Sequence, residues 1–387
     1  MKWVLNIKTL RFNKGSEVLT FEPFSFDTYL CIFEVFTSRT LNMKYTTLPN
    51  TDIKVSKICL GTMTFGQQNT QEEAFSQLDY ALEKGINFID TAEMYSTPAR
   101  EETYGLTEKI IGNWLKKSGK REEIILASKI GGANRGLEYM RDDLSFNAET
   151  ITLSLEKSLK RLQTDYVDLY QLHWPERKTN FFGQRGFVVE EEKWEDNTQQ
   201  VLEVLQDLIK QGKINHIGLS NETPWGLMRF MEESRKHNLP KMITVQNPYS
   251  LVNRSFEVGL SEICHREQIG LLAYSPMAFG VLSGKFLTGE AHPNARINLY
   301  PQFARYNSAN TREASRLYNE VAKDFGLTLT ELSLAFIESR PFVTSTIIGA
   351  TTLQQLKENI NTINVDLTVE ALKAIENIQN LIPDPAP

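Results

Sequence analysis

Short apolar runs recur along this chain, each separated from the next by a segment of helical periodicity, and this alternation limits the fold more than any other feature. Runs of this length bounded by turn residues are typical of β-strands. The predicted strands are Lys57–Leu60, Asn87–Asp90, Ile124–Lys129, Val167–Leu172, Ile214–Leu219, Met242–Val245, Gly270–Tyr274 and Ser345–Ile348.

The segments between these strands have the features of helices. In the segment 150–162 the apolar residues recur every three or four positions, as on one face of an amphipathic helix. Thr70 with Glu73, and Thr328 with Glu331, have the spacing of capping boxes that begin helices. Strands that alternate with single helices form parallel sheets through right-handed crossovers. Eight such units favour an α/β fold of a single (β/α)8 TIM barrel, and no G-x-G-x-x-G fingerprint follows an early strand to favour an open dinucleotide-binding sheet.

Composition excludes several classes of function. The 387 residues fit two average domains or one large barrel. The net charge of −6 gives no support for nucleic-acid binding, and no apolar run approaches the roughly 20 residues of a membrane span. Cys31, Cys59 and Cys264 form no CxxC pair, which argues against a disulfide framework and a zinc site and predicts a cytoplasmic protein. No partner protein is identifiable from the sequence.

The first 42 residues differ in character from the rest and are rich in aromatic residues, among them Phe21, Phe24 and Phe26. The sequence then restarts at Met43, and the strand–helix pattern is complete without what precedes it. We therefore expect an N-terminal extension at 1–42 and a barrel at 43–387. The extension is either a true, disordered arm or a translated leader, and the sequence leaves both readings open.

Three segments are too long to be simple connectors, and each of them follows a predicted strand. They are Thr91–Thr107, Trp174–Asp196 and Ser275–Thr311. In a barrel all three lie at the C-terminal mouth, which is where barrel enzymes build their active sites.

Four polar residues stand at or just after the ends of three successive predicted strands: Asp90, Tyr95, Lys129 and His173. Since the C-termini of barrel strands converge on one mouth, these side chains can meet. Their types suit carbonyl reduction, in which hydride addition creates alkoxide charge that needs a proton donor. Tyr95 is the expected acid, and a nearby Lys129 ammonium is expected to lower its pKa from about 10. Asp90 would anchor Lys129, and His173 would orient the carbonyl or relay a proton.

The segments around these residues resemble signature segments of the aldo-keto reductases. Asn87 to Tyr95 resembles their first signature, Leu126 to Lys129 their catalytic-lysine strand, and Asp165 to His173 their histidine strand. The resemblance runs from about Met43 to the C-terminus and is strongest to the bacterial Tas-type branch, related to the voltage-gated potassium-channel β subunits. It implies a TIM barrel that uses NADPH to reduce aldehydes or ketones to alcohols.

The resemblance also implies which residues hold NADPH. Ser220, Asn221 and Gln246 would bind the nicotinamide carboxamide, and Tyr274 would stack on the nicotinamide ring. The loop assigned to the pyrophosphate contains Ser275, Pro276, Met277, Ala278, Phe279, Gly280 and Lys285. Arg296 would pair with the 2′-phosphate, which favours NADPH over NADH, and Arg305 is the weaker candidate for that role. Further expected contacts are Thr62, Met63, Gln68, Asp90, Gly349, Thr351, Gln355, Glu358 and Asn359.

Two other classes of function stay open at this point. The channel β subunits have the same residues, so this chain is alternatively a regulatory NADPH sensor with slow reductase activity. Histidine and aspartate at strand ends also serve metal-dependent hydrolases, although the remaining histidines lack a shared ligand spacing. For a reductase, the expected substrate pocket consists of Met63, Tyr95, Trp174 and Phe279, which favours an apolar carbonyl compound.

Overall fold

The computed structural model describes residues 42–133, 136–300 and 305–387, and these residues contain a closed barrel of eight parallel strands. The barrel strands are β3 (Ile58–Gly61), β4 (Phe88–Asp90), β5 (Ile125–Ile130), β6 (Val167–Leu172), β7 (Ile214–Ser220), β8 (Met242–Pro248), β9 (Gly270–Tyr274) and β10 (Val343–Ile348). They follow one another around the barrel in chain order, and β10 closes it by pairing with β3. All eight predicted strands, and the predicted (β/α)8 TIM barrel, are confirmed.

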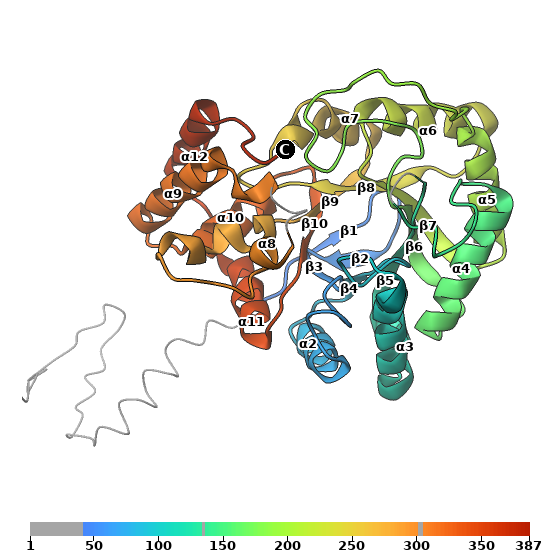
Figure 1. Ribbon diagram of the computed structural model, residues 1–387, viewed down its shortest axis with the longest axis horizontal. Helices are drawn as coiled ribbons and strands as arrows, with labels where there is room; N and C mark the ends of the chain where they lie inside the picture. The colour runs from blue at the N-terminus through green and yellow to red at the C-terminus, as the bar shows by residue number, and fades with distance from the viewer. Residues whose placement is uncertain (1–41, 134–135, 301–304) are drawn as a thin grey trace, which may run out of the picture. The chain divides into compact units, whose positions relative to one another are not determined.

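Helices follow the strands and lie around them on the outside (Figure 1). The helices are α2 (Gln71–Glu83), α3 (Leu106–Ser118), α4 (Ala148–Leu162), α5 (Thr198–Lys210), α6 (Pro224–His237), α7 (Leu260–Glu267), α8 (Arg296–Leu299), α9 (Ala309–Asp324), α10 (Leu329–Glu338), α11 (Leu353–Asn361) and α12 (Val369–Leu381). Both predicted capping boxes, Thr70 with Glu73 and Thr328 with Glu331, begin helices. Within the described residues, no helix is long and apolar enough to cross a bilayer.

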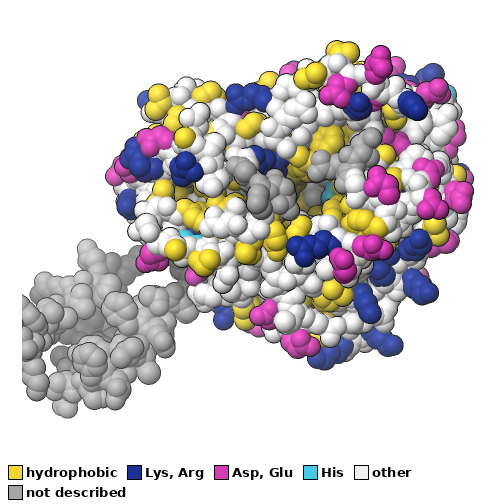
Figure 2. All heavy atoms as spheres, viewed as in Figure 1, with side chains coloured by type: hydrophobic (Ala, Val, Ile, Leu, Met, Phe, Trp, Pro, Cys, Tyr) yellow, Lys and Arg dark blue, Asp and Glu magenta, His cyan; other side chains and the backbone are white. Residues whose placement is uncertain are grey.

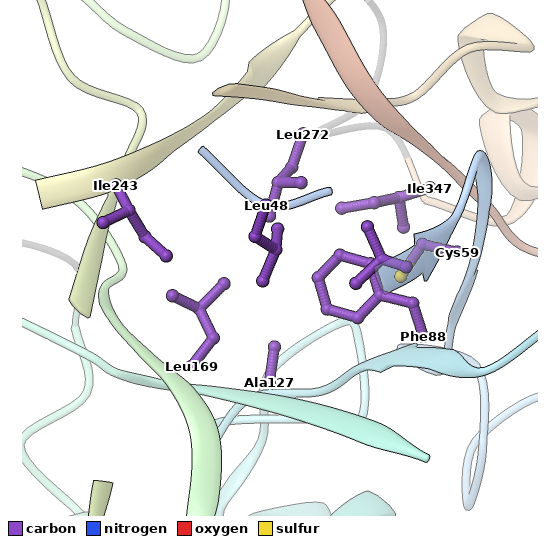
Figure 3. Close-up of a cluster of buried hydrophobic side chains, with 9 residues drawn as sticks. Leu48, Cys59, Phe88, Ala127, Leu169, Ile243, Leu272 and Ile347 are labelled. Carbon is purple, nitrogen blue, oxygen red and sulfur yellow. The ribbon is translucent and has the colours of Figure 1, made fainter. Parts of the chain in front are cut away.

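A short antiparallel hairpin precedes the barrel, and the sequence pattern did not predict it. Its strands are β1 (Tyr45–Thr47) and β2 (Lys54–Ser56). The turn between them carries Leu48, whose side chain is fully buried among residues of the barrel interior (Figure 3). Neither strand contains an apolar run, since their sequences are Tyr-Thr-Thr and Lys-Val-Ser, so the apolar pattern could not reveal them. The hairpin supplies apolar volume that the strands themselves lack.

The barrel interior is layered, because side chains two positions apart on a strand face the same side. An apolar layer contains Leu48, Cys59, Phe88, Ala127, Leu169, Ile243, Leu272 and Ile347 (Figure 3). Two residues further toward the strand ends, Asp90 follows Phe88, Lys129 follows Ala127, and Gln171 follows Leu169. The polar layer therefore lies directly above the apolar one, on the side of the mouth.

Residues 1–41 of the predicted N-terminal extension lie outside the part of the chain that the structure describes. Its separation from the barrel at 43–387 therefore remains a prediction, and Cys31 also lies outside the described residues. The other two cysteines, Cys59 and Cys264, are free thiols and are buried.

Candidate active site

Lys129 lies at the centre of the polar layer, with its side chain fully buried. Its ammonium donates to Asp90 Oδ2 at 2.7 Å and to the carbonyl oxygen of Thr91 at 2.7 Å. The same Nζ lies 3.5 Å from Tyr95 Oη. The strand ends and the loop after β4 thus bring three of the four predicted catalytic residues into direct contact.

The pKa of Tyr95 is raised above its ordinary value, so the predicted lowering is wrong in its net direction. Burial of the phenol is the main cause; Lys129 does lower the pKa, as expected, but Asp90 raises it again. Burial also opposes the charge of Lys129, yet Asp90 and Tyr95 together raise the pKa of that ammonium. At neutral pH the site therefore holds a protonated phenol beside a charged ammonium.

His173 follows the last residue of β6 and lies next to Tyr95. The two rings are arranged edge to face, with centroids 5.7 Å apart. The imidazole also lies 4.7 Å from the Trp174 ring. Since Tyr95 contacts both Lys129 and His173, all four predicted catalytic residues share one site.

Two amide side chains hold the other oxygen of Asp90. Gln246 Nε2 donates to Asp90 Oδ1 at 2.8 Å, and Gln171 Nε2 donates to the same oxygen at 3.3 Å. Gln246 was predicted in the site, whereas Gln171 was not. The available signal was a polar residue within a predicted strand, two positions before His173 and hence on the same face.

Ser220 and Asn221, also predicted to hold the carboxamide, form a second hydrogen-bonded group with Tyr274, which was predicted to stack on the nicotinamide ring. Tyr274 Oη donates to Asn221 Oδ1 at 2.6 Å, and Asn221 Nδ2 donates to the His173 carbonyl oxygen at 2.8 Å. Ser220 Oγ donates to the Gln246 carbonyl oxygen at 2.9 Å. The structure brings these residues together next to His173, although both polar groups of the Asn221 amide already have protein partners.

The segment after β9 begins with an unusual backbone. Ser275, Ala278, Phe279 and Gly280 all have positive φ angles. At Gly280 a Cβ atom would lie 3.1 Å from Lys285 Nζ, so this lysine crosses directly over the glycine. The Ala278 and Gly280 amides donate to the carbonyl oxygens of Ser275 and Met277 within the loop, so Lys285 is the group of this loop best suited to a phosphate.

Arg296, at the start of α8, is held by neutral groups. Its Nε donates to Gln68 Oε1 at 3.3 Å, its Nη1 lies 3.8 Å from Met63 Sδ, and its guanidinium stacks 5.0 Å from the Phe279 ring centroid. Burial lowers the pKa of Arg296 to about 10. In the part of the chain that the structure describes, no carboxylate forms an ion pair with Arg296 or Lys285. Two desolvated cations without a carboxylate fit an anionic ligand.

The weaker phosphate candidate, Arg305, lies elsewhere in the site. Its Nη2 donates to Tyr306 Oη at 3.0 Å, and it also contacts Tyr274. It therefore belongs to the Tyr274 end of the site.

Among the residues predicted to contact the adenosine end of the cofactor, Thr351 donates to Gln355 Oε1 at 3.1 Å at the start of α11. Of the remaining candidates, Gly349 and Glu358 are exposed, Asn359 is buried, and Thr62 donates to the Asp90 carbonyl oxygen at 2.8 Å.

Trp174 is almost fully buried, because a fourth long connection covers it. This connection, between β5 and α4, was not singled out from the sequence. Trp174 Nε1 donates to the Ala133 carbonyl oxygen at 3.0 Å, and the indole packs against Leu137, Met140 and Leu144. Gly131 and Gly132 pass beside the indole, where a Cβ atom would lie 3.3 Å from it. From the sequence alone, the pair Gly131 and Gly132 directly after β5 was the feature that could have pointed to this connection.

The described residues contain no group of three or more His, Cys, Asp or Glu side chains arranged to hold a metal ion. The polar groups that the structure places together at the mouth are Asp90, Tyr95, Lys129, His173 and the amides beside them. On the face of the molecule drawn in Figure 2, hydrophobic side chains gather around the middle.

A barrel with these four residues at its mouth defines an oxidoreductase of the aldo-keto reductase class, and comparison with known proteins agrees. The model of the Aldo/keto reductase family matches residues 57–380, so the chain belongs to that family. Protein tas of Escherichia coli is 46% identical over 351 residues, which cover 89% of this chain and 100% of that protein. The chain is thus an aldo/keto reductase of the Tas type.

Two less similar relatives have names that describe an oxidoreductase or a reductase. The uncharacterized oxidoreductase YrpG of Bacillus subtilis is 33% identical, over 87% of this chain and 96% of that protein. Norsolorinic acid reductase B of Aspergillus parasiticus is 28% identical, over 90% of this chain and 87% of that protein.

Proposed function

We propose that this protein is an NADPH-dependent reductase that converts aldehydes or ketones to alcohols, with Tyr95 as the proton donor. The observation that carries the proposal is the buried contact of Lys129 with both Asp90 and Tyr95. Burying an ammonium is costly unless it is paired. Buried ionisable groups with perturbed pKa values are concentrated at functional sites. The reductase name of the Aspergillus relative supports the same class of reaction.

The preference for the phosphorylated cofactor rests on Arg296 and Lys285. These cations have no carboxylate partner among the described residues, and a 2′-phosphate and a pyrophosphate would supply the missing negative charge. Ser220, Asn221 and Gln246 would hold the nicotinamide carboxamide, and Tyr274 would stack on the nicotinamide ring. When bound, NADPH supplies the hydride, and the protein contributes position and electrostatics.

The residues of the chain have distinct parts in the reaction. Tyr95 donates its phenolic proton to the carbonyl oxygen of the substrate as negative charge develops there. Lys129 stabilises the phenolate that remains, because its ammonium lies 3.5 Å from Tyr95 Oη. His173 donates a hydrogen bond that orients the carbonyl, and Asp90 keeps Lys129 in place. We expect Met63, Phe279 and the side of Trp174 that contacts His173 to border the substrate and to favour apolar compounds.

The test is reduction of a panel of simple aldehydes and ketones with NADPH or NADH, using the wild-type chain and Tyr95→Phe. Loss of the general acid is expected to lower kcat by about 10²- to 10⁴-fold. Affinity for NADPH should stay unchanged, because the phenol is not assigned to phosphate binding. Wild-type turnover by Tyr95→Phe would contradict the role of Tyr95. Tight NADPH binding without turnover of any carbonyl would instead favour the sensor function.

A further inference from the structure

We infer that Gln171 is a positioning residue that ties the proton donor and the nicotinamide-holding amide together. The inference rests on the proposed function and extends it to a residue that neither the motifs nor the comparisons assign. Gln171 is fully buried on β6, next to Lys129 on β5 in the strand register. Its side chain lies in the polar layer, between Asp90 and Gln246.

The hydrogen-bond directions around Gln171 follow from chemistry alone. Asp90 Oδ1 is an acceptor, so the atoms near it must be amide nitrogens: Gln171 Nε2 at 3.3 Å and Gln246 Nε2 at 2.8 Å. With its nitrogen turned to Asp90, Gln171 offers its oxygen to the second N–H of Gln246, at 3.2 Å. The three side chains thus form a closed ring of hydrogen bonds.

This ring fixes the orientation of the Gln246 amide. Both of its N–H groups are directed to Asp90 and Gln171, which leaves Gln246 Oε1 as the group that can accept from the NH₂ of a carboxamide. The same ring restrains the Asp90 carboxylate, whose other oxygen holds Lys129 at 2.7 Å. One glutamine therefore supports both the cofactor contact and the acid.

The neighbouring strand packs directly against Gln171. Gly218 on β7 pairs with Gln171, and a Cβ atom at Gly218 would lie in ordinary contact, 3.4 Å from Gln171 Cγ. The same Cβ atom would clash with Thr244 Oγ1 on β8, so glycine is required there by Thr244 and not by Gln171. Buried polar groups need hydrogen-bond partners, so a glutamine at this buried position requires the partners that it has.

The experiment is Gln171→Met, which keeps the side-chain volume and removes both hydrogen bonds. Misplacement of the acid is expected to lower kcat by about 10- to 100-fold. The Kd for NADP⁺ should rise by about three- to tenfold, since one restraint on Gln246 is lost. The KM for the carbonyl substrate should stay within about twofold of wild type, because Gln171 does not reach the substrate walls.

The matched control is Asp168→Asn on the same strand. Asp168 Oδ2 accepts from Arg121 at 2.8 Å and from the Leu126 amide at 2.9 Å, away from the polar layer. This variant should lower Tm and leave kcat and the Kd for NADP⁺ unchanged. A double-mutant cycle with Gln246→Met should be non-additive, because both residues act through Asp90.

The inference is overturned if Gln171→Met has wild-type kcat and NADP⁺ affinity, or if its losses match those of Asp168→Asn at equal loss of Tm. It is also overturned if the cycle with Gln246→Met is additive. Gln171→Leu replaces the methionine variant if that protein does not fold. Should the wild type reduce no carbonyl, the proposed function fails, and the NADP⁺ affinities of the variants still test the role of Gln171.

Discussion

Two layers of the same barrel interior, one above the other, differ completely in chemistry. The lower layer, around Leu48 and Phe88, is apolar and closed by the hairpin (Figure 3). The upper layer contains Asp90, Lys129 and Gln171, all buried and all hydrogen-bonded. Because the upper layer is polar and lies on the side of the mouth, it is expected to determine reactivity. The apolar lower layer is expected to determine stability. Substitutions in each layer test that division.

The largest effect is expected for Lys129→Met. The variant removes the cation from Asp90 and Tyr95, so reduction should fall by about 10²- to 10³-fold. It also leaves a buried carboxylate unpaired, which should cost about 3–5 kcal/mol of unfolding free energy. Turnover assays and urea unfolding measure the two effects.

A second variant sharpens the Lys129 result. Adding Asp90→Asn removes the unpaired charge and should restore part of the stability without restoring activity. A variant that regained both would contradict the assignment of this pair to the chemistry.

Leu48→Ala tests the lower layer. Removing a fully buried leucine should lower the unfolding free energy by about 2–5 kcal/mol, because the surrounding barrel cannot fill the cavity. kcat at a temperature well below Tm should stay within about twofold of wild type. Leu381→Ala is the control, since Leu381 is largely exposed and should change stability by less than about 0.5 kcal/mol. A large loss of kcat in Leu48→Ala would break the proposed division between layers.

Arg296→Leu is expected to have a smaller and selective effect. It removes the cation proposed to bind the 2′-phosphate, so the Kd for NADPH should rise by about 10- to 100-fold. The Kd for NADH should change little. Arg266→Leu, at an exposed arginine of α7, is the control. Equal losses for both cofactors would place the phosphate elsewhere.

The smallest effect is expected in the pH profile. Tyr95 acts in its protonated form, so activity is lost as pH rises through its pKa. Since burial raises that pKa, kcat for reduction should stay constant through neutral pH and fall only above about pH 10. Lys129 lowers the same pKa, so the residual activity of Lys129→Met should persist to still higher pH. A basic limb near pH 7 would contradict the direction of this shift.

Much of the fold was predictable because the strands and helices have strong periodicity. The eight strands and the two capping boxes follow from local sequence, and so does the meeting of Asp90, Lys129 and His173 at one mouth. Long connections after β4, β6 and β9 were also predicted, but the first and third run into the starts of α3 and α9, and the third contains α8. The hairpin was not predictable, because neither of its strands contains an apolar run. The connection that covers Trp174 was missed because its described residues form short turns after a glycine pair, without a periodic pattern.

The sequence by itself determined which residues end the strands, and therefore which side chains reach the mouth. Only the tertiary structure decided the balance of forces there. Burial outweighs the effect of Lys129 on the pKa of Tyr95, and this depends on how completely the surrounding chain covers the phenol. The partners of Gln171 were equally hidden, because Gln246 and Asp90 are 75 and 81 residues away from it along the chain. Spacing within a strand fixes the face on which a side chain lies, but closure of the barrel fixes which side chains it meets.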